Sequence, residues 1–331
     1  MSRSIKAIVY QAHGKPEEVL RLAGQELAPV GTGEALVRLL AAPINPADLN
    51  AIEGKYPVRP ELPATPGFEG AGVVEEVGAG VRNVGVGMQV ILPHNLGTWR
   101  EAAVVAADKL VVVPNEIAPE QAAMLKINPL TAWRMLHDFV RLEPGDWVIQ
   151  NAANSAAGRA VIQIARELGY RTVNVVRRKE LIEELRAEGG DVVLLDDDDL
   201  RDAAAEATDR APIRLALNAV GGESALRLAK SVAPDATIVT FGAMSLKPLT
   251  LPNGLLIFKN LRFTGFWVNK WYERATATER DETFERLFDL AKHGLLQTKI
   301  ERTYSLGDFR EAVARAAEGK RAGKILFSTA G

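Results

Sequence analysis

A short segment near the middle of the chain combines residue types that suit phosphate binding. Residues 151–158 read NAANSAAG, follow the apolar run Trp147–Gln150, and open a stretch with apolar residues at helical spacing. Small side chains let a backbone approach a phosphate closely, and the N-terminus of a helix attracts its charge. Only one glycine of the usual G-x-G-x-x-G pattern is present, so an ordinary capped helix start is the alternative interpretation.

A second group with binding chemistry follows the next apolar run. Thr172–Val176 is succeeded by the three cations Arg177, Arg178 and Lys179. A carboxylate at this position would hold the ribose 2′-hydroxyl of NADH, whereas cations suit the 2′-phosphate of NADPH. The sequence therefore predicts NADPH rather than NADH. The alternative is that these cations form the basic first turn of a surface helix.

Strands and helices alternate between about residues 120 and 265. Nearly all-apolar strands separated by amphipathic helices are typical of a parallel sheet covered on both faces, which places these two motifs at one sheet edge. The expected helices include Lys179–Glu188, Leu200–Ala207 and Ser224–Val232. The expected strands are Trp147–Gln150, Thr172–Val176, Val192–Leu195, Ile213–Asn218, Ala236–Phe241 and Leu261–Phe266.

The flanking parts of the chain have a different pattern. Short β-like runs, including Ala71–Val77, alternate with Gly and Pro clusters up to about residue 120, which predicts a partly closed β domain. After residue 270 two helical segments and the strand Lys324–Ser328 are too short for a domain of their own. We therefore expect a catalytic domain formed by 1–120 and 270–331, and a nucleotide-binding domain formed by 121–269.

Composition limits the possible functions. The net charge of −2 disfavours a general nucleic-acid binder, and no apolar run is long enough to predict a membrane span. The first residues show no signal- or transit-peptide pattern, which predicts a cytoplasmic location. The chain has no Cys and only four His, none of them in a ligand-spaced motif, so we expect no metal site. Without a metal to bind an alkoxide, reduction of a conjugated double bond is favoured over alcohol oxidation.

Several segments together resemble a known family. They read APINPADLN (42–50), GKYP (54–57), PELPA (60–64), LGTWR (96–100), INPLTA (127–132), VIQNAANS (148–155), LIFK (256–259) and GFW (265–267). With these segments the sequence resembles the medium-chain dehydrogenase/reductase superfamily, and within it the 2-enoyl thioester reductases. The resemblance runs from about Lys6 to Phe327. The resemblance implies an α/β fold, with a doubly wound Rossmann domain and a β-rich, partly closed GroES-like domain.

The resemblance also implies a reaction. Hydride from NADPH would add to the β-carbon of an enoyl-CoA or an enoyl thioester of acyl carrier protein in fatty acid metabolism, and Tyr56 would be the catalytic donor. A phenol stays protonated at neutral pH and can donate to the developing enolate. Zinc-binding members of the superfamily carry Cys near Asn45 and His at Phe68, and both are replaced here. A homodimer, formed through the strand near Leu261–Phe266, is implied as well.

The cofactor contacts are carried over residue by residue. Two departures from the family pattern stand near them: Ala156 and Ala157 replace Gly and Val, and Arg159 replaces Gln. The implied contacts are Asn128, Asn154, Ser155, Ala156, Ala157, Arg177, Arg178, Lys179, Phe241, Gly242, Ala243, Met244, Phe266, Trp267, Val268, Asn269 and Lys324.

Two other functions fit parts of the same pattern. A zinc-free NADPH-dependent quinone or enone reductase would share the cofactor site but lack the arrangement of Asn45–Asp48 and Tyr56. A non-catalytic NADPH-binding regulatory protein would keep the cofactor site alone. Both remain alternatives to an enoyl thioester reductase.

Overall fold

A computed structural model describes residues 3–329, which form two units. Unit 1 comprises the described residues up to Ile127 and those from Gln297 onward, and unit 2 is Asn128–Leu296. The four remaining residues of the catalytic domain expected from the sequence (1, 2, 330 and 331) lie outside the described range.

The second boundary of unit 2 differs from the one near 270 that the sequence suggested. Helix α11 (Ala277–Lys292) packs against α4 (Asn128–Asp138), which begins unit 2. Arg134 on α4 donates to Glu279 at 2.9 Å, and its guanidinium lies over the ring of Trp271 on α10 (Val268–Arg274). These contacts place residues 270–296 in unit 2.

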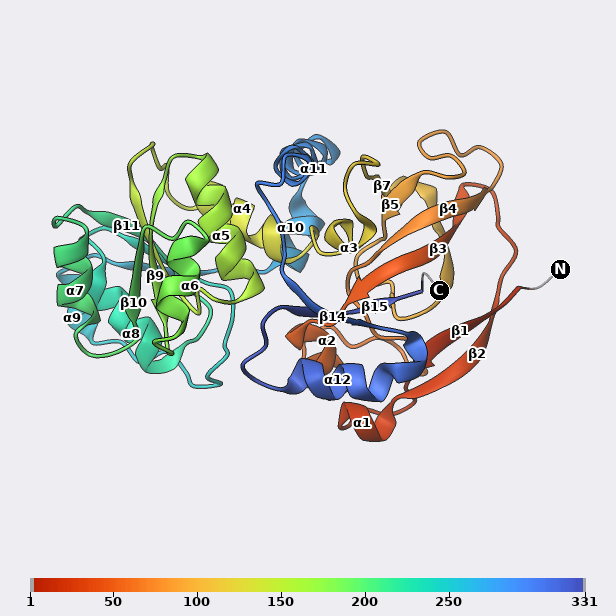
Figure 1. The fold of residues 1–331 in the computed structure, drawn as a ribbon, viewed down its shortest axis with the longest axis horizontal. Helices are drawn as coiled ribbons and strands as arrows, with labels where there is room; N and C mark the ends of the chain where they lie inside the picture. Colours follow the sequence, from red (N-terminus) through yellow and green to blue (C-terminus); the bar gives the residue numbers. More distant parts are fainter. Residues whose placement is uncertain (1–2, 330–331) are drawn as a thin grey trace. The chain divides into compact units, whose positions relative to one another are not determined.

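Unit 2 is built on a six-stranded parallel sheet in the order β10-β9-β8-β11-β12-β13. Figure 1 labels its strands β9, β10 and β11. The alternation of strands and helices expected from the sequence is confirmed, and the ranges of β10 and β11 agree with those expected. The strands are β8 (Trp147–Asn151), β9 (Arg171–Val176), β10 (Val192–Leu195), β11 (Ile213–Asn218), β12 (Thr237–Thr240) and β13 (Arg262–Gly265).

Both faces of this sheet are covered by helices. Val176 and Val193 share a hydrophobic cluster with Ile162 and Leu185 of the helices on one face, whereas Val175 packs with Leu200 and Leu228 on the other. Burial on both faces explains why these strands are almost entirely apolar. The helices are α5 (Ala156–Glu167) and α6 (Leu181–Ala187) on the first face, and α7 (Leu200–Ala207), α8 (Gly222–Ser231) and α9 (Asn253–Ile257) on the second.

Unit 1 is rich in strands. A seven-stranded sheet runs β14-β15-β3-β4-β5-β7 with β6 also paired to β3, and β1 pairs with β2 in a separate ribbon. Its strands are β1 (Arg3–Val9), β2 (Arg21–Leu27), β3 (Glu34–Pro43), β4 (Ala71–Val77), β5 (Gln89–Ile91), β6 (Ala102–Ala106), β7 (Val111–Val112), β14 (Ile300–Tyr304) and β15 (Lys324–Ser328). Its helices are α1 (Pro16–Val19), α2 (Pro46–Ile52), η1 (Ala107–Lys109), α3 (Pro119–Ala122), η2 (Leu306–Asp308) and α12 (Phe309–Ala317).

The C-terminal segment completes unit 1 because β15 inserts beside β3. Leu326 and Phe327 pair with Pro43 and Ala42 in antiparallel register, and the ring of Phe327 packs edge-on against Trp99 at 5.1 Å. This pairing brings Lys324 next to the start of α2, far from it in sequence. Within residues 3–329, none of the helices has the length and apolar character needed to cross a membrane.

Candidate active site

The turn at residues 151–158 opens helix α5 as the sequence predicted. Ser155 is the N-cap, and its Oγ accepts a hydrogen bond from the N–H of Gly158 at 3.1 Å. A Cβ at Gly158 would lie 2.5 Å from the carbonyl oxygen of Ala153, so this position requires glycine. The first-turn N–H groups of Ala156 and Ala157 are those that a helix leaves for an external acceptor such as a phosphate.

The cations expected to bind the 2′-phosphate lie directly beyond the end of β9. Asn151 and Val175 are paired in the sheet, so β8 and β9 end side by side. Arg177 and Lys179 are exposed and Arg178 is half-buried. In the described part of the chain none of the three forms an ion pair, which leaves their charge available to an anionic ligand.

The ends of β12 and β13 carry the other cofactor contacts expected in unit 2. Phe241, Gly242, Phe266 and Trp267 are half-buried, Val268 and Asn269 are buried, and Ala243 and Met244 are exposed. At the start of α4, the Asn128 side chain holds a buried Nδ2 without a hydrogen-bond partner among residues 3–329. This unpartnered amide, the free helix N-terminus and the three unpaired cations all fit a dinucleotide phosphate, so the residues of unit 2 suit NADPH.

A buried polar network lies at the carboxyl ends of the strands of unit 2, and the sequence did not predict it. Asn151 Nδ2 donates to Asn218 Oδ1 and Ser224 Oγ at 2.9 Å each, and Asn151 Oδ1 accepts from the N–H of Ala219 at 2.7 Å. Asn218 Nδ2 also donates to Thr240 Oγ1 at 3.1 Å. The network ties the ends of β8, β11 and β12 together. Its sequence signal is an Asn ending each of two apolar strands.

Tyr56 lies in unit 1, just beyond helix α2. Gly54 ends the helix with φ of +73°, and a Cβ there would lie 3.1 Å from the His13 ring, so the turn that orients Tyr56 favours glycine. The Tyr56 ring is half-buried and packs against Phe68, with 5.5 Å between the ring centroids. The two aromatic rings therefore support each other within unit 1.

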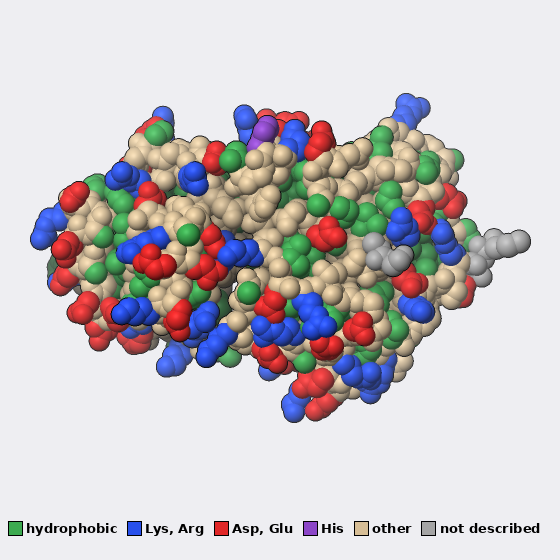
Figure 2. Space-filling model, viewed as in Figure 1, with side chains coloured by type: hydrophobic (Ala, Val, Ile, Leu, Met, Phe, Trp, Pro, Cys, Tyr) green, Lys and Arg blue, Asp and Glu red, His purple; other side chains and the backbone are tan. Residues whose placement is uncertain are grey.

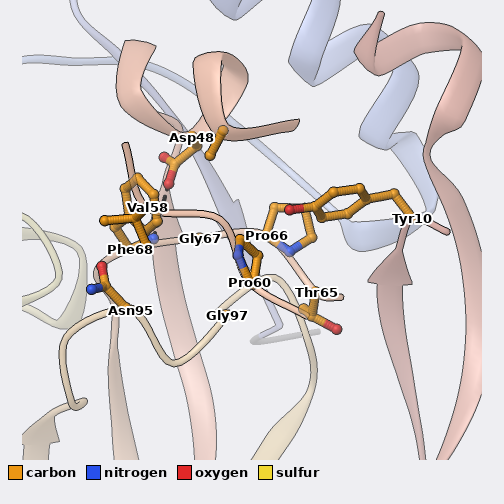
Figure 3. Close-up of a pocket in the computed structure, with 11 residues that line it drawn as sticks. Tyr10, Asp48, Val58, Pro60, Thr65, Pro66, Gly67, Phe68, Asn95 and Gly97 are labelled. Atoms are coloured by element: carbon orange, nitrogen blue, oxygen red, sulfur yellow. Dashed lines mark hydrogen bonds between the residues drawn. The ribbon is translucent and has the colours of Figure 1, made fainter. Parts of the chain in front are cut away.

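Asp48 joins helix α2 to the loop that carries Phe68. One carboxylate oxygen accepts from the N–H of Asn45 at 2.7 Å. The other accepts from the N–H of Phe68 at 2.9 Å, and Figure 3 shows Asp48 and Phe68. Asp48 also borders a cavity of about 30 Å³ between Tyr10, Pro60 and Phe68. That volume suits one or two water molecules rather than an acyl chain.

Four charged side chains are buried beside Asn45. Burial raises the pKa of Asp48 to about 7 and raises the pKa of Glu69, and it lowers the pKa of Lys126 to about 7 and that of Lys324 to about 8. Glu69 accepts from Asn45 Nδ2 at 2.9 Å, and the Lys324 ammonium donates to Asn45 Oδ1 and to the carbonyl oxygen of Ile44. The resemblance implies a cofactor contact for Lys324, which stays a prediction; the bonds of its ammonium to Asn45 and Ile44 lie within unit 1.

The side-chain amide of Asn45 both donates and accepts within unit 1. Its Nδ2 satisfies Glu69 and its Oδ1 satisfies Lys324, so its side chain is engaged within the buried cluster. The described residues contain no group of three or more His, Asp or Glu side chains placed to hold a metal ion.

On the face shown in Figure 2, basic and acidic side chains are interspersed. An alternation of both signs differs from the continuous basic surface of a general nucleic-acid binder.

Comparison with known proteins agrees with this geometry. Residues 31–115 match the family model of the alcohol dehydrogenase GroES-like domain, and residues 189–326 match that of the zinc-binding dehydrogenases. The mitochondrial enoyl-[acyl-carrier-protein] reductase of Xenopus tropicalis is 41% identical over 94% of this chain and 92% of its own length. The human protein of the same name is 42% identical over 93% of this chain and 84% of its own.

Solved structures are similar over almost the full length. A complex of Etr1p with NADP and crotonyl-CoA has a TM-score of 0.91 and 28% identity over 98% of this chain and 100% of that one. The Etr1p/Etr2p heterodimer, a mitochondrial 2-enoyl thioester reductase from Candida tropicalis, has a TM-score of 0.89, 28% identity and the same coverage. A putative NADPH:quinone reductase from Bacillus thuringiensis has a TM-score of 0.91 and 31% identity over 99% of both chains.

These relatives correct one expectation and confirm another. The cytoplasmic location expected from the N-terminal residues is wrong by this comparison, because the similar reductases are named as mitochondrial proteins. The α/β fold with a parallel-sheet unit and a β-rich unit is confirmed. This chain belongs to the medium-chain dehydrogenase/reductase superfamily, in the branch of the enoyl-[acyl-carrier-protein] reductases.

Proposed function

We propose that this chain reduces the C2–C3 double bond of trans-2-enoyl thioesters with NADPH. The observation that carries this function is similarity to enoyl thioester reductases across both units, which includes the segment around Tyr56 as well as the cofactor turn. The chain is thus an NADPH-dependent oxidoreductase of fatty acid metabolism that acts on enoyl-CoA or on enoyl groups of acyl carrier protein. Unit 1 serves as the catalytic domain and unit 2 as the NADPH-binding domain.

Tyr56 is the catalytic residue in this proposal. Bound NADPH supplies the hydride for the β-carbon, so negative charge develops toward the thioester oxygen. The reduction is completed by a proton at the α-carbon. The phenol of Tyr56 donates either a hydrogen bond to the developing charge or that proton, and an aimed donor of this kind lowers the barrier to the reaction. Phe68 supports the ring of Tyr56, and Asp48 fixes the backbone of Phe68.

The cofactor is held by residues at the carboxyl ends of the strands of unit 2. The N–H groups at the start of α5 face the pyrophosphate, and the cations after β9 bind the 2′-phosphate. The segments after β12 and β13 line the nicotinamide half, and the amide of Asn128 donates to the cofactor. The residues proposed for these contacts are Asn128, Asn154, Ser155, Ala156, Ala157, Arg177, Arg178, Lys179, Phe241, Gly242, Ala243, Met244, Phe266, Trp267, Val268 and Asn269.

The similarity to the structure called a putative NADPH:quinone reductase supports quinone reduction as a second candidate activity. One assay separates the candidates: oxidation of NADPH measured side by side with crotonyl-CoA, a longer 2-enoyl-CoA and a naphthoquinone. We expect turnover with the enoyl thioesters. Turnover with the quinone alone would show that the chain is a quinone reductase and not an enoyl thioester reductase. NADP⁺ binding without any turnover would indicate a regulatory NADPH-binding protein.

A homodimer formed through β13 is part of the same proposal. β13 ends the six-stranded sheet, and three of its four residues are exposed (Arg262, Thr264 and Gly265). An uncovered strand edge offers unpaired N–H and C=O groups to a second strand. Apolar side chains lie exposed in neighbouring segments, among them Ile257 (67% exposed) and Phe258 (87% exposed). A second copy of the chain would cover both features.

A further inference from the structure

Arg159 is a buried cation of unit 2 that none of the cofactor contacts includes. It lies on helix α5 with 10% of its side chain exposed. Charged side chains are rarely so buried without partners. The contacts of its guanidinium therefore indicate what it does.

The guanidinium joins two elements of the cofactor site. Its Nε donates to the carbonyl oxygen of Asn154, inside the phosphate turn, at 3.2 Å. Its two terminal nitrogens bind carboxylates on the α6 side: Nη2 pairs with Glu184 at 2.8 Å, and Nη1 pairs with Glu188. Arg159 thus bridges the turn and the helix that follows the second strand.

The cations expected to bind the 2′-phosphate directly precede helix α6. The N–H of Leu181 bonds to the carbonyl oxygen of Arg178, and the N–H of Ile182 bonds to that of Lys179, so these cations are continuous with the first turn of α6. Leu181 and Leu185 also share a buried cluster with Ala153 of the phosphate turn. A shift of α6 relative to the turn would therefore move the cations relative to the pyrophosphate position.

The charges of this bridge rule out simple attraction of the cofactor as its purpose. One guanidinium faces two carboxylates, so the three side chains together carry a net negative charge, which would repel a phosphate rather than attract it. The bridge instead fixes the distance between two proposed anion subsites, which are the phosphate turn and the cations after β9. NADPH must occupy both subsites at once, whereas NADH needs only the phosphate turn.

We propose that Arg159 is a positioning residue that sets the preference for NADPH over NADH by holding α6 at a fixed distance from the phosphate turn. The role follows from the contacts that one guanidinium makes with both the phosphate turn and the α6 side. It rests on the NADPH-dependent reaction proposed above, and it concerns cofactor binding rather than the reduction step.

The test is titration of NADP⁺ and NAD⁺ onto the purified protein without enoyl substrate, followed by tryptophan fluorescence or calorimetry. In Arg159→Gln we expect NADP⁺ to bind on the order of tenfold more weakly and NAD⁺ to change by less than about threefold, in the range of coupling between contacting residues. Arg159→Lys keeps one charged contact and is expected to recover part of the NADP⁺ affinity. Arg166→Gln, at an exposed site on the same helix, is the matched control and should behave as wild type.

Removing Arg159 alone takes the cation away from two neighbouring carboxylates, Glu184 and Glu188, so a variant that also neutralises them is needed. The triple variant Arg159→Gln/Glu184→Gln/Glu188→Gln removes their repulsion together with the bridge, and we expect it to keep the NADP⁺ defect. Return of the triple variant to wild-type affinity, or equal losses for both cofactors in Arg159→Gln, would overturn the positioning role. If Arg159→Gln does not fold, the triple variant and Arg159→Lys give the same decision.

The outcome is separable from that of the proposed function. Crotonyl-CoA reduction by the wild-type enzyme tests the function, and the two titrations do not require it. If the wild-type enzyme does not reduce crotonyl-CoA but the titrations give the expected result, the enoyl substrate is rejected and the role of Arg159 stands.

Discussion

The N–H of Phe68 donates to Asp48 Oδ1 at 2.9 Å, and this hydrogen bond joins the first turn of α2 to the loop before β4. Tyr56 follows α2 and packs its ring on Phe68. Asp48 therefore links the helix that precedes Tyr56 to the backbone of Phe68. Gly67 makes the loop possible, because a Cβ there would lie 2.4 Å from Thr98 Oγ1 and its φ is +106°. The position of the proposed donor therefore depends on a buried carboxylate.

Tyr56→Phe removes the hydroxyl and keeps the ring against Phe68. We expect turnover with crotonyl-CoA to fall by about 10²-fold or more, since a positioned acid contributes at least that much. NADP⁺ affinity, measured by fluorescence titration, should remain within about twofold of wild type. Tyr170→Phe, whose hydroxyl donates to the carbonyl oxygen of Leu142 in unit 2, is the control. Near-normal turnover in Tyr56→Phe would remove this residue from the mechanism.

Arg177→Ala/Arg178→Ala removes two of the cations after β9. Charge-assisted hydrogen bonds are worth about 1.5–3 kcal/mol, so the KM for NADPH should rise by roughly 10- to 100-fold. The KM for NADH should change little, because NADH has no 2′-phosphate. Arg201→Ala, which removes a cation at another exposed site, is the control. A lower KM for NADH than for NADPH in the wild-type enzyme would contradict the predicted cofactor preference.

Asp48 predicts a specific pH dependence of stability. Its pKa is about 7 in the folded chain against an ordinary 3.8, so the folded state holds the proton more strongly than the unfolded state. The stability it contributes is therefore fully present below about pH 4 and is lost as the pH rises through 7. Lys126 and Lys324, whose pKa values are lowered, act in the opposite sense at higher pH, between the folded value and 10.5.

Asp48→Asn checks this dependence by urea unfolding at pH 5 and pH 8. At pH 5 the folded wild type holds the protonated acid, because the pKa of Asp48 is about 7. The second oxygen of the acid can still accept from the N–H of Asn45, whereas the NH2 group of an amide cannot, so we expect a loss of about 1–3 kcal/mol at pH 5. The difference between wild type and variant should shrink at pH 8, since only wild type then pays to keep a buried carboxylate ionised. Asp108→Asn, at an exposed carboxylate, is the control. If the stability of wild type relative to Asp48→Asn grew from pH 5 to pH 8, the predicted direction of the pH dependence would be wrong.

Ile257→Asp/Phe258→Asp tests the proposed dimer. Two charges placed on exposed apolar positions beside β13 should convert a dimer to a monomer, as measured by light scattering during gel filtration. Affinity for NADP⁺ should stay close to wild type, because the cofactor contacts lie at the strand ends rather than at this edge. Val86→Asp, an exposed apolar residue in unit 1, serves as control. A wild-type chain that is monomeric at micromolar concentration would reject the dimer.

Strands buried on both faces were the easiest part of this fold to predict. Val192–Leu195 and Ile213–Asn218 have the ranges expected, because a continuous apolar run is long enough to define them. β2 and β14 were missed, since each buries only one residue (Leu27 and Tyr304) and has no clear alternation. Helix α10 was not predicted either; only its first two residues, Val268 and Asn269, were expected to have a role, as cofactor contacts.

The sequence by itself determined the chemistry available: a small-residue turn that opens a helix, cations after the second strand, a phenol after α2, and no thiol for a zinc site. These features are local, and local residue types suffice to define them. Only the tertiary structure decided which distant groups share one environment. Lys324 meets Asn45 through the pairing of β15 with β3, and Arg159 meets Glu184 and Glu188 through the packing of α5 and α6 on one sheet face. Such contacts depend on strand register and helix packing, to which each residue contributes only a small part of the energy.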